Sequence, residues 1–292
     1  MKPQIEKLGT VDVDLVETNP VVFADRLYRF EYVRPNYPRN HTGDSYFRFV
    51  DRETGEPTPA FARGRHLGCA FVEGHAAYVT CVDIWDGEHL ILYTSNDLRY
   101  WDERPILDLP GYGLFNTSLC RAHDRYVLMF EVGKPPRVAG VRFTGYFAFS
   151  TDLAHWELAP PECNYAKDRY TAPHCLRYLN GSYYDFYLEA HEGYEQRVVR
   201  SRDLVHWEAS PHNPVLKASP EDRRVANPKL TPLERQRIAT ATNLNNSDID
   251  FCEHRGRVLI TYSWGNQQGV EHLAEAVFPG TEQEFLEGWF AR

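Results

Sequence analysis

The sequence predicts an all-β protein, a five-bladed β-propeller with one short inserted helix and a short C-terminal helix. Three observations support this prediction: a turn phrase that occurs three times, hairpin segments that recur with it, and an excess of aromatic residues. Aromatics make up 14% of the 292 residues, and they favour strands over helices. Repeats of about 40 to 55 residues match propeller blades of four short strands each.

The repeated phrase has the pattern S-x-D-L-x-x-W-[DE] and runs over residues 95–102, 150–157 and 201–208. Each copy follows an apolar stretch, as expected of a strand that enters a tight turn. The Ser and Asp side chains can bond the local backbone and stabilise that turn. The Leu and Trp then return to the core, so we interpret the three Trp side chains as packing between sheets rather than as sugar-stacking residues.

A second pattern opens each unit with a cysteine-containing strand and a hairpin turn. Together the two patterns predict a single domain over residues 1–292. Its blades lie approximately at residues 20–60, 65–108, 115–160, 170–216 and 247–280, and the first is the most divergent. The alternating segment 10–16 could complete the last blade.

Residues 217–246 fall outside the repeat and form an insertion. Within it, Thr231 and Glu234 make a capping box with Pro232 at the first helical position, which predicts a short helix. A second capping box at residues 281–284 predicts a terminal helix docked on the propeller. The insertion could cover one mouth of the central channel or serve a subunit contact.

Charge and composition exclude several classes of protein. The formal net charge of −9 disfavours nucleic-acid binding, which needs clustered cations. No apolar run is long enough for a membrane span, and the start MKPQIEKLG lacks the apolar core of a signal peptide. We therefore expect a cytoplasmic protein without nucleic-acid or membrane partners. No particular oligomeric state is indicated.

The six cysteines are spread along the chain without a metal-type spacing, and we expect buried thiols. No metal site or cofactor is predicted from them. A structural ion in the central channel of the propeller is a separate option that the sequence leaves open.

The turn phrase and the blade pattern resemble those of the five-bladed propeller glycoside hydrolases of families 43, 62, 32, 68 and 117, and of the related family 130 phosphorylases. The resemblance covers about residues 20 to 280. Its most specific part is the segment Thr171-Ala-Pro-His-Cys-Leu-Arg-Tyr-Leu-Asn-Gly-Ser-Tyr-Tyr184, which is similar to a blade opening of these enzymes.

The resemblance also has mismatches. The general acid that it implies is a Glu, and Thr171 stands at that position. The blade-opening Asp-Pro of these families has no clear match, because Asn19-Pro20 and Asn116 stand where it would be sought. Other carboxylates, or a His as proposed for family 117, would then have to act, or the propeller would only bind sugar.

Glycoside hydrolysis needs an acid and a base or nucleophile on opposite sides of the bond. When the opening strands are aligned on their cysteines, Asp248 is the only carboxylate at its level, and alternation places Asp250 on the same face. The second strands place Glu31, Asp83, Glu131 and Glu189 near their ends. We predict Asp248 as base and Glu189 or Glu131 as acid, with ion pairing as the structural alternative.

Residues with hydrogen-bonding or stacking side chains near these positions are the candidate substrate-binding set. Trp264 with Asn266 and Gln267 combines an apolar ring with amide groups, as sugar sites do. The full set is Arg65, His66, Asp83, Asn116, His174, His191, Trp264, Asn266 and Gln267.

These features predict a glycoside hydrolase that cleaves a plant, algal or microbial oligosaccharide with paired carboxylates at the propeller mouth. Two alternatives stay open. A glycoside phosphorylase would need a phosphate pocket, for which Arg65 and His66 are candidates. A non-catalytic carbohydrate-binding propeller would be consistent with Thr171.

Overall fold

The computed structural model describes residues 2–35, 37, 43–190 and 193–291. Strands dominate this part of the chain, with three α-helices and two single-turn 3-10 helices. The predicted all-β class, the inserted helix and the C-terminal helix are confirmed. Among the described residues, no helix is long and apolar enough to cross a membrane.

The strands pair into antiparallel units of neighbouring strands. The first unit holds β2 (Asn19–Phe23), β3 (Arg26–Val33) and β4 (Tyr46–Asp51); the second holds β5 (His66–Glu73), β6 (Ala76–Val82), β7 (His89–Ser95) and β8 (Asp102–Asp108). The third holds β9 (Gly113–Ala122), β10 (Arg125–Lys134), β11 (Thr144–Ser150) and β12 (Glu157–Leu158). The fourth holds β13 (Thr171–Leu179), β14 (Ser182–Ala190), β15 (Tyr194–Ser201) and β16 (Trp207–Ala209). The fifth holds β17 (Asn245–His254), β18 (Arg257–Gly265), β19 (Glu271–Phe278) and the N-terminal strand β1 (Glu6–Val13).

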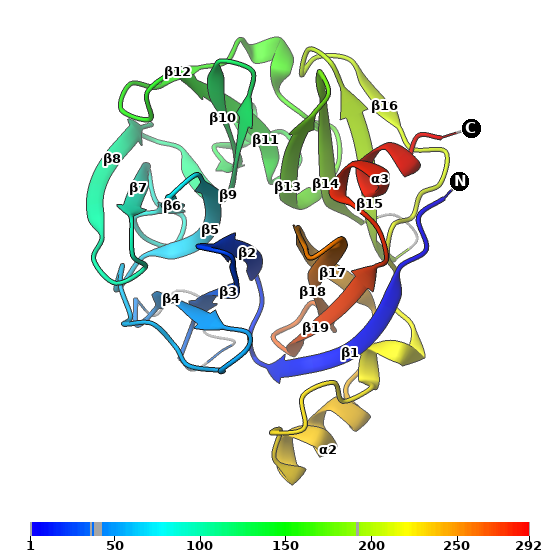
Figure 1. Cartoon of the computed structure of the whole chain (residues 1–292). Helices are drawn as coiled ribbons and strands as arrows, with labels where there is room; N and C mark the ends of the chain where they lie inside the picture. The colour runs from blue at the N-terminus through cyan, green and yellow to red at the C-terminus, as the bar shows by residue number, and fades with distance from the viewer. Residues whose placement is uncertain (1, 36, 38–42, 191–192, 292) are drawn as a thin grey trace.

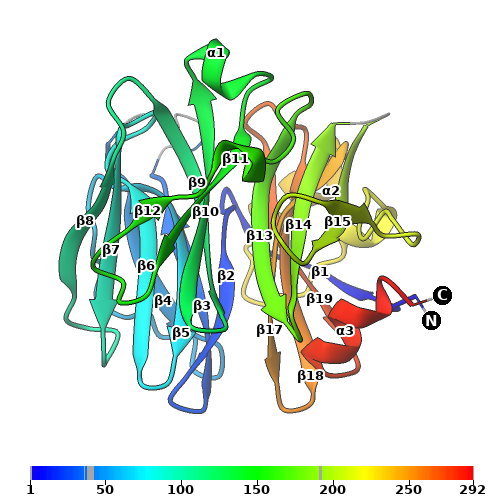
Figure 2. The ribbon, with the colours of Figure 1, turned by 90° about the horizontal axis from the view of Figure 1, so that it is seen from above.

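The first strand of each unit lies innermost. β2 contacts β5, β5 contacts β9, β9 contacts β13, β13 contacts β17, and β17 contacts β2. Figure 1 shows the sheets grouped around a common centre with these strands nearest to it, and Figure 2 shows the strands running along that axis.

The turn phrase has the same geometry in its three copies. The Ser hydroxyl accepts the backbone N–H of the Leu at 2.8 to 2.9 Å, and the Asp carboxylate accepts the next two N–H groups. Each of the three Leu residues has a positive φ, a strained conformation that these bonds hold. Trp101 stacks on Phe61 at 4.1 Å between ring centroids and Trp207 contacts Tyr165 at 5.2 Å, whereas Trp156 packs against the apolar core.

A one-residue bulge recurs in four innermost strands, and it determines which side chains face the channel mouth. In each case two residues of the inner strand stand opposite one residue of the next strand, which re-aims the side chains locally. The pairs are 67–68 opposite Cys81, 115–116 opposite Glu131, 172–173 opposite Leu188, and 248–249 opposite Tyr262.

Helix α3 (Glu282–Gly288) packs its apolar side on the fourth and fifth units, where Phe285 stacks on Phe186 and meets Phe251 edge-on. The predicted capping boxes of α3 and of α2 (Pro232–Thr240) are both present. The six cysteines are free thiols, and five of them are buried, as predicted.

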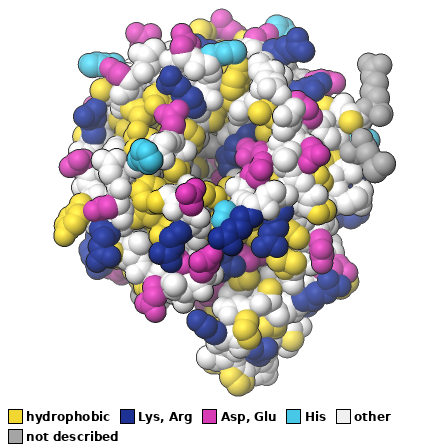
Figure 3. All heavy atoms as spheres, in the orientation of Figure 1, with side chains coloured by type: hydrophobic (Ala, Val, Ile, Leu, Met, Phe, Trp, Pro, Cys, Tyr) yellow, Lys and Arg dark blue, Asp and Glu magenta, His cyan; other side chains and the backbone are white. Residues whose placement is uncertain are grey.

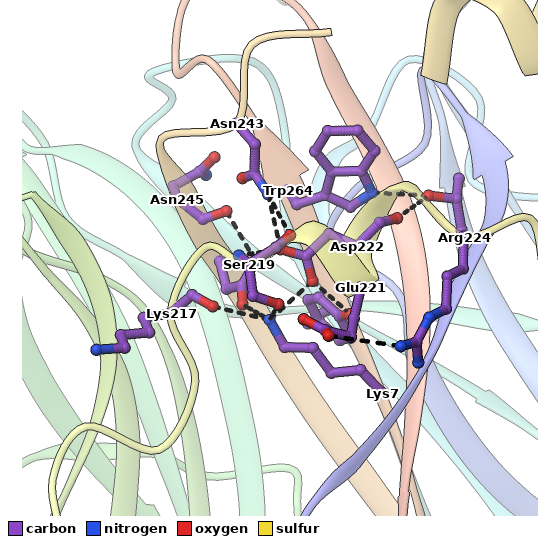
Figure 4. Close-up of polar contacts among 12 residues, drawn as sticks. Lys7, Lys217, Ser219, Glu221, Asp222, Arg224, Asn243, Asn245 and Trp264 are labelled. Atoms are coloured by element: carbon purple, nitrogen blue, oxygen red, sulfur yellow. Dashed lines mark hydrogen bonds and ion pairs between the residues drawn. The ribbon is translucent and has the colours of Figure 1, made fainter. Parts of the chain in front are cut away.

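The insertion lies against β1 at the outer edge of the molecule (Figure 1), so it does not cover the channel. Its anchor is the carboxylate of Asp222, which accepts hydrogen bonds from Lys7 at 2.8 Å and Tyr262 at 2.8 Å. The backbone of Ser219 and the amides of Asn243 and Asn246 donate to the same carboxylate (Figure 4). We call these six residues the Asp222 cluster.

Candidate functional site

A cavity of about 500 Å³ opens where the innermost strands begin. This is the end of the molecule at which Figure 2 shows helix α1 (Pro136–Ala139), a single turn that the sequence did not predict. Its wall combines acidic, amide and aromatic side chains. The residues used below are Glu17, Arg34, Trp85, Phe115, Asn116, Glu131, Phe143, Tyr170, Asp248, Gln267 and Glu271.

The inner strands contribute one level of this cavity through their bulges. Leu67, Phe115, Ala172 and Asp248 are the first residues of the four bulge pairs, and all of them line the cavity. Glu17 lies just before β2 and also lines it. Glu17 and Asp248 both have a φ of 52°, which is unusual for residues with side chains and often marks functional positions.

Glu131 reaches the cavity because it stands opposite a bulge. Its side chain is 1% exposed, and Asn116 of that bulge donates an amide N–H to Oε2 at 3.0 Å. Among the described residues, Oε1 has no hydrogen-bond partner. Burial raises the pKa of Glu131 well above its usual value, and the nearby charges of Glu17 and Asp248 add to this effect. The raised pKa favours the protonated form of Glu131, as a general acid requires.

Asp248 belongs to the last unit, and its carboxylate accepts the hydroxyl of Ser247 at 2.7 Å. Burial raises its pKa, whereas the hydrogen bond from Ser247, the nearby Ser263 hydroxyl and the charge of Arg34 lower it in part. These hydroxyl and guanidinium groups favour the ionised form. Asp248 is thus better suited than Glu131 to act as a base.

Glu17 and Glu271 are two further carboxylates of the cavity. Glu17 forms an ion pair with Arg34 at 3.3 Å, and burial still raises its pKa to about 7. Glu271 accepts the backbone N–H of Gln267 at 2.6 Å, and burial raises its pKa to about 7 as well. Both groups titrate near neutral pH.

Four aromatic side chains that line the cavity form a chain of edge-to-face contacts. Trp85 contacts Phe115 at 5.7 Å, Phe115 contacts Phe143 at 4.7 Å, and Phe143 contacts Tyr170 at 5.7 Å between ring centroids. Aromatic faces bind the apolar faces of sugars and also attract cations. We call these four residues the aromatic wall.

The channel below the cavity is filled by paired polar groups. Asp250 binds Arg177 at 2.5 Å and the amide of Asn19, so it does not face the cavity as the expected alternation with Asp248 would require. The bulge at 248–249 breaks that alternation. The opposite face has its own hollow (Figure 3), which is lined in part by Arg121, Arg177 and Glu282.

The structure separates the predicted catalytic residues. Asp248 and Glu131 line one cavity, but Glu189 does not. Leu188 is the residue opposite the bulge of the fourth unit, so Glu189 is one position later and points to the other face. There it lies within 3.4 Å of Arg197 and 3.6 Å of Arg169. The structure therefore places Glu189 outside this cavity, so its position does not support the prediction that it acts as the acid of this site.

Three residues of the second unit also lie away from the cavity. Arg65 binds Glu103 at 2.7 Å and Tyr93 at 3.2 Å, and His66 bonds the Tyr32 hydroxyl at 2.5 Å. Burial lowers the pKa of His66 to about 4, so its ring is neutral. Asp83 accepts the N–H of His89 at 3.3 Å in a strand-end turn. Arg65 and His66 therefore do not form the phosphate pocket that a phosphorylase would need.

Of the other predicted binding residues, Asn116 and Gln267 line the cavity. Asn266 builds the same loop by accepting the N–H groups of Gln268 and Val270. His191 lies outside the described residues.

Trp264 and His174 have structural surroundings instead. Trp264 is fully buried, and its indole N–H points to the Thr10 hydroxyl at 2.8 Å (Figure 4). It therefore cannot stack on a sugar. His174 uses one ring nitrogen for Asp185 at 2.8 Å and the other for the Thr171 carbonyl at 3.0 Å.

The sequence did not single out Glu17, Arg34, Glu271 or the aromatic wall as site residues. Glu17 had one usable signal, since it stands two residues before the Asn19-Pro20 opening. The others lie within the predicted blades but in neither of the two repeated patterns, most of them in loops or at strand ends. Among the described residues, no group of His, Cys, Asp and Glu side chains has the arrangement of a metal site.

No protein-family model matches the chain, and no curated protein matches it in sequence. Solved structures do match. One glycoside hydrolase has a TM-score of 0.62 at 13% identity, over 94% of this protein and 92% of the hydrolase. A thermostable family-43 glycoside hydrolase gives 0.60 at 10% identity, over 90% and 89%. The xylan β-1,4-xylosidase of Bacillus halodurans C-125 gives 0.60 at 15% identity, over 93% of this protein and 54% of the xylosidase.

The fold is that of the propeller glycoside hydrolases. At these identities the similarity concerns the fold and does not transfer catalytic residues.

Proposed function

We propose that this protein is a glycoside hydrolase in which Glu131 acts as general acid and Asp248 as base or nucleophile. The observation that carries the proposal is that both carboxylates project into one cavity from different units of a glycoside-hydrolase fold. Within the described part of the chain, neither forms an ion pair. Two carboxylates with different protonation are what glycoside cleavage requires.

The two carboxylates divide the reaction between them. Protonated Glu131 donates its proton to the glycosidic oxygen as the bond to the leaving group breaks. Ionised Asp248 either deprotonates an attacking water or attacks the sugar carbon directly, and inversion or retention of the product, measured by NMR, distinguishes these routes. Asn116 holds Glu131 in place through the 3.0 Å bond to Oε2 and leaves Oε1 for the substrate.

The architecture supports this use of the cavity. We infer that the five units are the blades of one closed propeller domain, because the inner strands contact one another in a ring and β1 completes the last unit. Closure places β10 and β17 at one central mouth. The substrate that we propose is an oligosaccharide, in keeping with the aromatic and amide groups of the wall.

The positions at which the resemblance implies catalytic carboxylates hold neutral residues. Asn19 binds Asp250, and Asn116 binds Glu131. Thr171 is fully buried and does not line the cavity. The proposed chemistry therefore uses carboxylates that lie at other positions around the same mouth.

The test compares Glu131→Gln and Asp248→Asn with Glu189→Gln, which makes the same kind of change outside the cavity. A panel of aryl glycosides is assayed with each purified protein. We expect the first two variants to lose about 10²-fold or more of kcat/KM, whereas Glu189→Gln retains activity. Wild-type levels in Glu131→Gln and Asp248→Asn would refute the assignment, and sugar binding without turnover in the wild type would favour a binding propeller.

A further inference from the structure

The cavity has an unbalanced charge. Glu17, Glu131, Asp248 and Glu271 line it, and Arg34 is the only cationic side chain among the described lining residues. If these four carboxylates and the guanidinium were all ionised, the formal charge of these lining residues would be −3. Arg34 is also engaged, since it pairs with Glu17 and stacks on Tyr32 and Tyr37.

Buried carboxylates elsewhere in the described chain have basic partners close by. Asp250 has Arg177 at 2.5 Å, Asp222 has Lys7 at 2.8 Å, and Asp185 has His174 at 2.8 Å. In the cavity, by contrast, the described donors to Glu131 and Glu271 are all amide and backbone N–H groups. Oε1 of Glu131, on a side chain that is 99% buried, has no partner among the described residues.

A buried carboxylate without a cation is costly, and the cost is relieved either by a proton or by a bound cation. Protons relieve it where no cation is bound, because burial raises the pKa of Glu17 and Glu271 to about 7 and also raises that of Glu131. The charges that face these groups are Arg34 and Asp248, with Asp185 also near Glu131. A cationic ligand would replace the protons of Glu17 and Glu271 and leave that of Glu131 for catalysis.

The aromatic wall is the second, independent feature. Four rings line the side of the cavity, and ring faces attract cations. The wall already does so at its rim, where the Arg142 guanidinium lies 4.9 Å from the centre of Phe143 and 5.6 Å from that of Phe115. Carboxylates and aromatic rings that line one cavity suit a ligand with both an apolar face and a positive charge.

We propose that the cavity selects amino sugars, whose ammonium group is held by the carboxylates while the sugar ring packs on the aromatic wall. This inference rests on the proposed carbohydrate function and specifies its substrate class. A neutral sugar would leave the excess carboxylates protonated. An acidic sugar would add a further negative charge to them.

The experiment measures binding to the wild-type protein by calorimetry at pH 7. The ligands are matched sets: glucosamine, glucose and N-acetylglucosamine, and the corresponding galactose and mannose sets. We expect at least one amine to bind about tenfold or more tightly than both neutral members of its set. In two buffers of different ionisation enthalpy, the carboxylates should release protons as that amine binds.

Glu271→Gln removes one cavity charge and keeps the shape, and it should reduce the preference for the amine; Glu189→Gln is the matched control and should not. Equal affinity within every set, or no binding of any amine, overturns the inference. A preference in the wild type that Glu271→Gln leaves unchanged overturns the assigned carboxylates. Amine preference without turnover of any glycoside would refute the hydrolase and leave this inference standing, whereas turnover of neutral glycosides without preference would do the reverse.

Discussion

The Asp222 cluster and the cavity both hold buried carboxylates, but they satisfy them differently. Asp222 accepts from Lys7, Tyr262, Ser219, Asn243 and Asn246. Burial alone would raise its pKa, but Lys7 and these bonds outweigh that effect and the pKa is lowered. Glu131 accepts a single hydrogen bond within the described part of the chain, and its pKa is raised. A carboxylate whose oxygens all have hydrogen-bond or ion-pair partners stabilises the fold. A carboxylate with an oxygen that has no partner is available to react with a substrate.

The largest expected effect tests Glu131, the cavity carboxylate of this comparison. Glu131→Gln should lower kcat/KM by about 10²- to 10⁴-fold, the usual contribution of a general acid. It should not lower the melting temperature, because it replaces a group that is costly to ionise with a neutral one of the same shape. Calorimetric unfolding and the glycoside assay are run on the same preparation. Loss of activity together with a lower melting temperature would assign Glu131 to structure instead.

The second prediction tests Asp222, the carboxylate with a full set of hydrogen-bond donors. Lys7→Met leaves Asp222 buried without its cation, and such losses cost about 3 to 5 kcal/mol of folding free energy. Urea unfolding should show this decrease, while kcat/KM of the folded variant stays within about twofold, because the cluster lies at the edge of the molecule. If Lys7→Met unfolds like the wild type, the Asp222 cluster is not the anchor of the insertion.

The third prediction concerns pH. In the folded protein Glu17 and Glu271 keep their protons to a pKa of about 7, whereas the unfolded chain loses them near 4.5. The folded state then binds more protons than the unfolded state. The free energy of unfolding therefore decreases as pH rises from about 4.5 through 7, by up to about 3 kcal/mol per group, and the protein becomes less stable. Glu271→Gln should match the wild type at pH 5 and exceed it at pH 8. Parallel stability curves for the two proteins would contradict the raised pKa.

The smallest expected effect concerns Glu189. Its ion pairs with Arg169 and Arg197 are partly exposed, and such pairs contribute at most about 1 kcal/mol. Glu189→Gln should therefore change both stability and kcat/KM little. A loss of kcat/KM as large as that in Glu131→Gln would show that Glu189 takes part in catalysis and is not only a structural ion-pair partner.

Sequence reasoning reached the repeat, the all-β class, the capped helices and four cavity residues: Asn116, Glu131, Asp248 and Gln267. It failed where a strand departs from regular pairing. Aligning the second strands by their acidic residues treated Glu131, Glu189 and Asp83 as equivalent, but the bulges make Leu188 and Cys81 the counterparts of Glu131. A shift of one residue moves a side chain to the other face of a sheet.

The aromatic residues also show that the sequence patterns predict the position of a side chain only where the residue belongs to a repeated motif. The three Trp residues of the turn phrase were correctly assigned to packing, because the phrase itself defines their surroundings. Trp264 was expected at a sugar site and is buried in the last unit, whereas Trp85 lines the cavity. Trp85 and Phe143 lie in the loops that join the second and third strands of their units. These loops belong to neither of the two repeated patterns, so the repeat does not indicate where the two side chains point.

The pairing of β1 with β19 has a consequence for how the chain is made. Glu6 pairs with Val277 and Val13 with His272, so β1 leaves the ribosome long before its partner β19 is synthesised. Contacts over so long a separation form slowly and leave an edge strand unpaired in the meantime. Ribosome-bound chains that stop before residue 271 should therefore keep residues 6–13 accessible to protease. A chain released without those residues would expose the edge of β19 to other molecules.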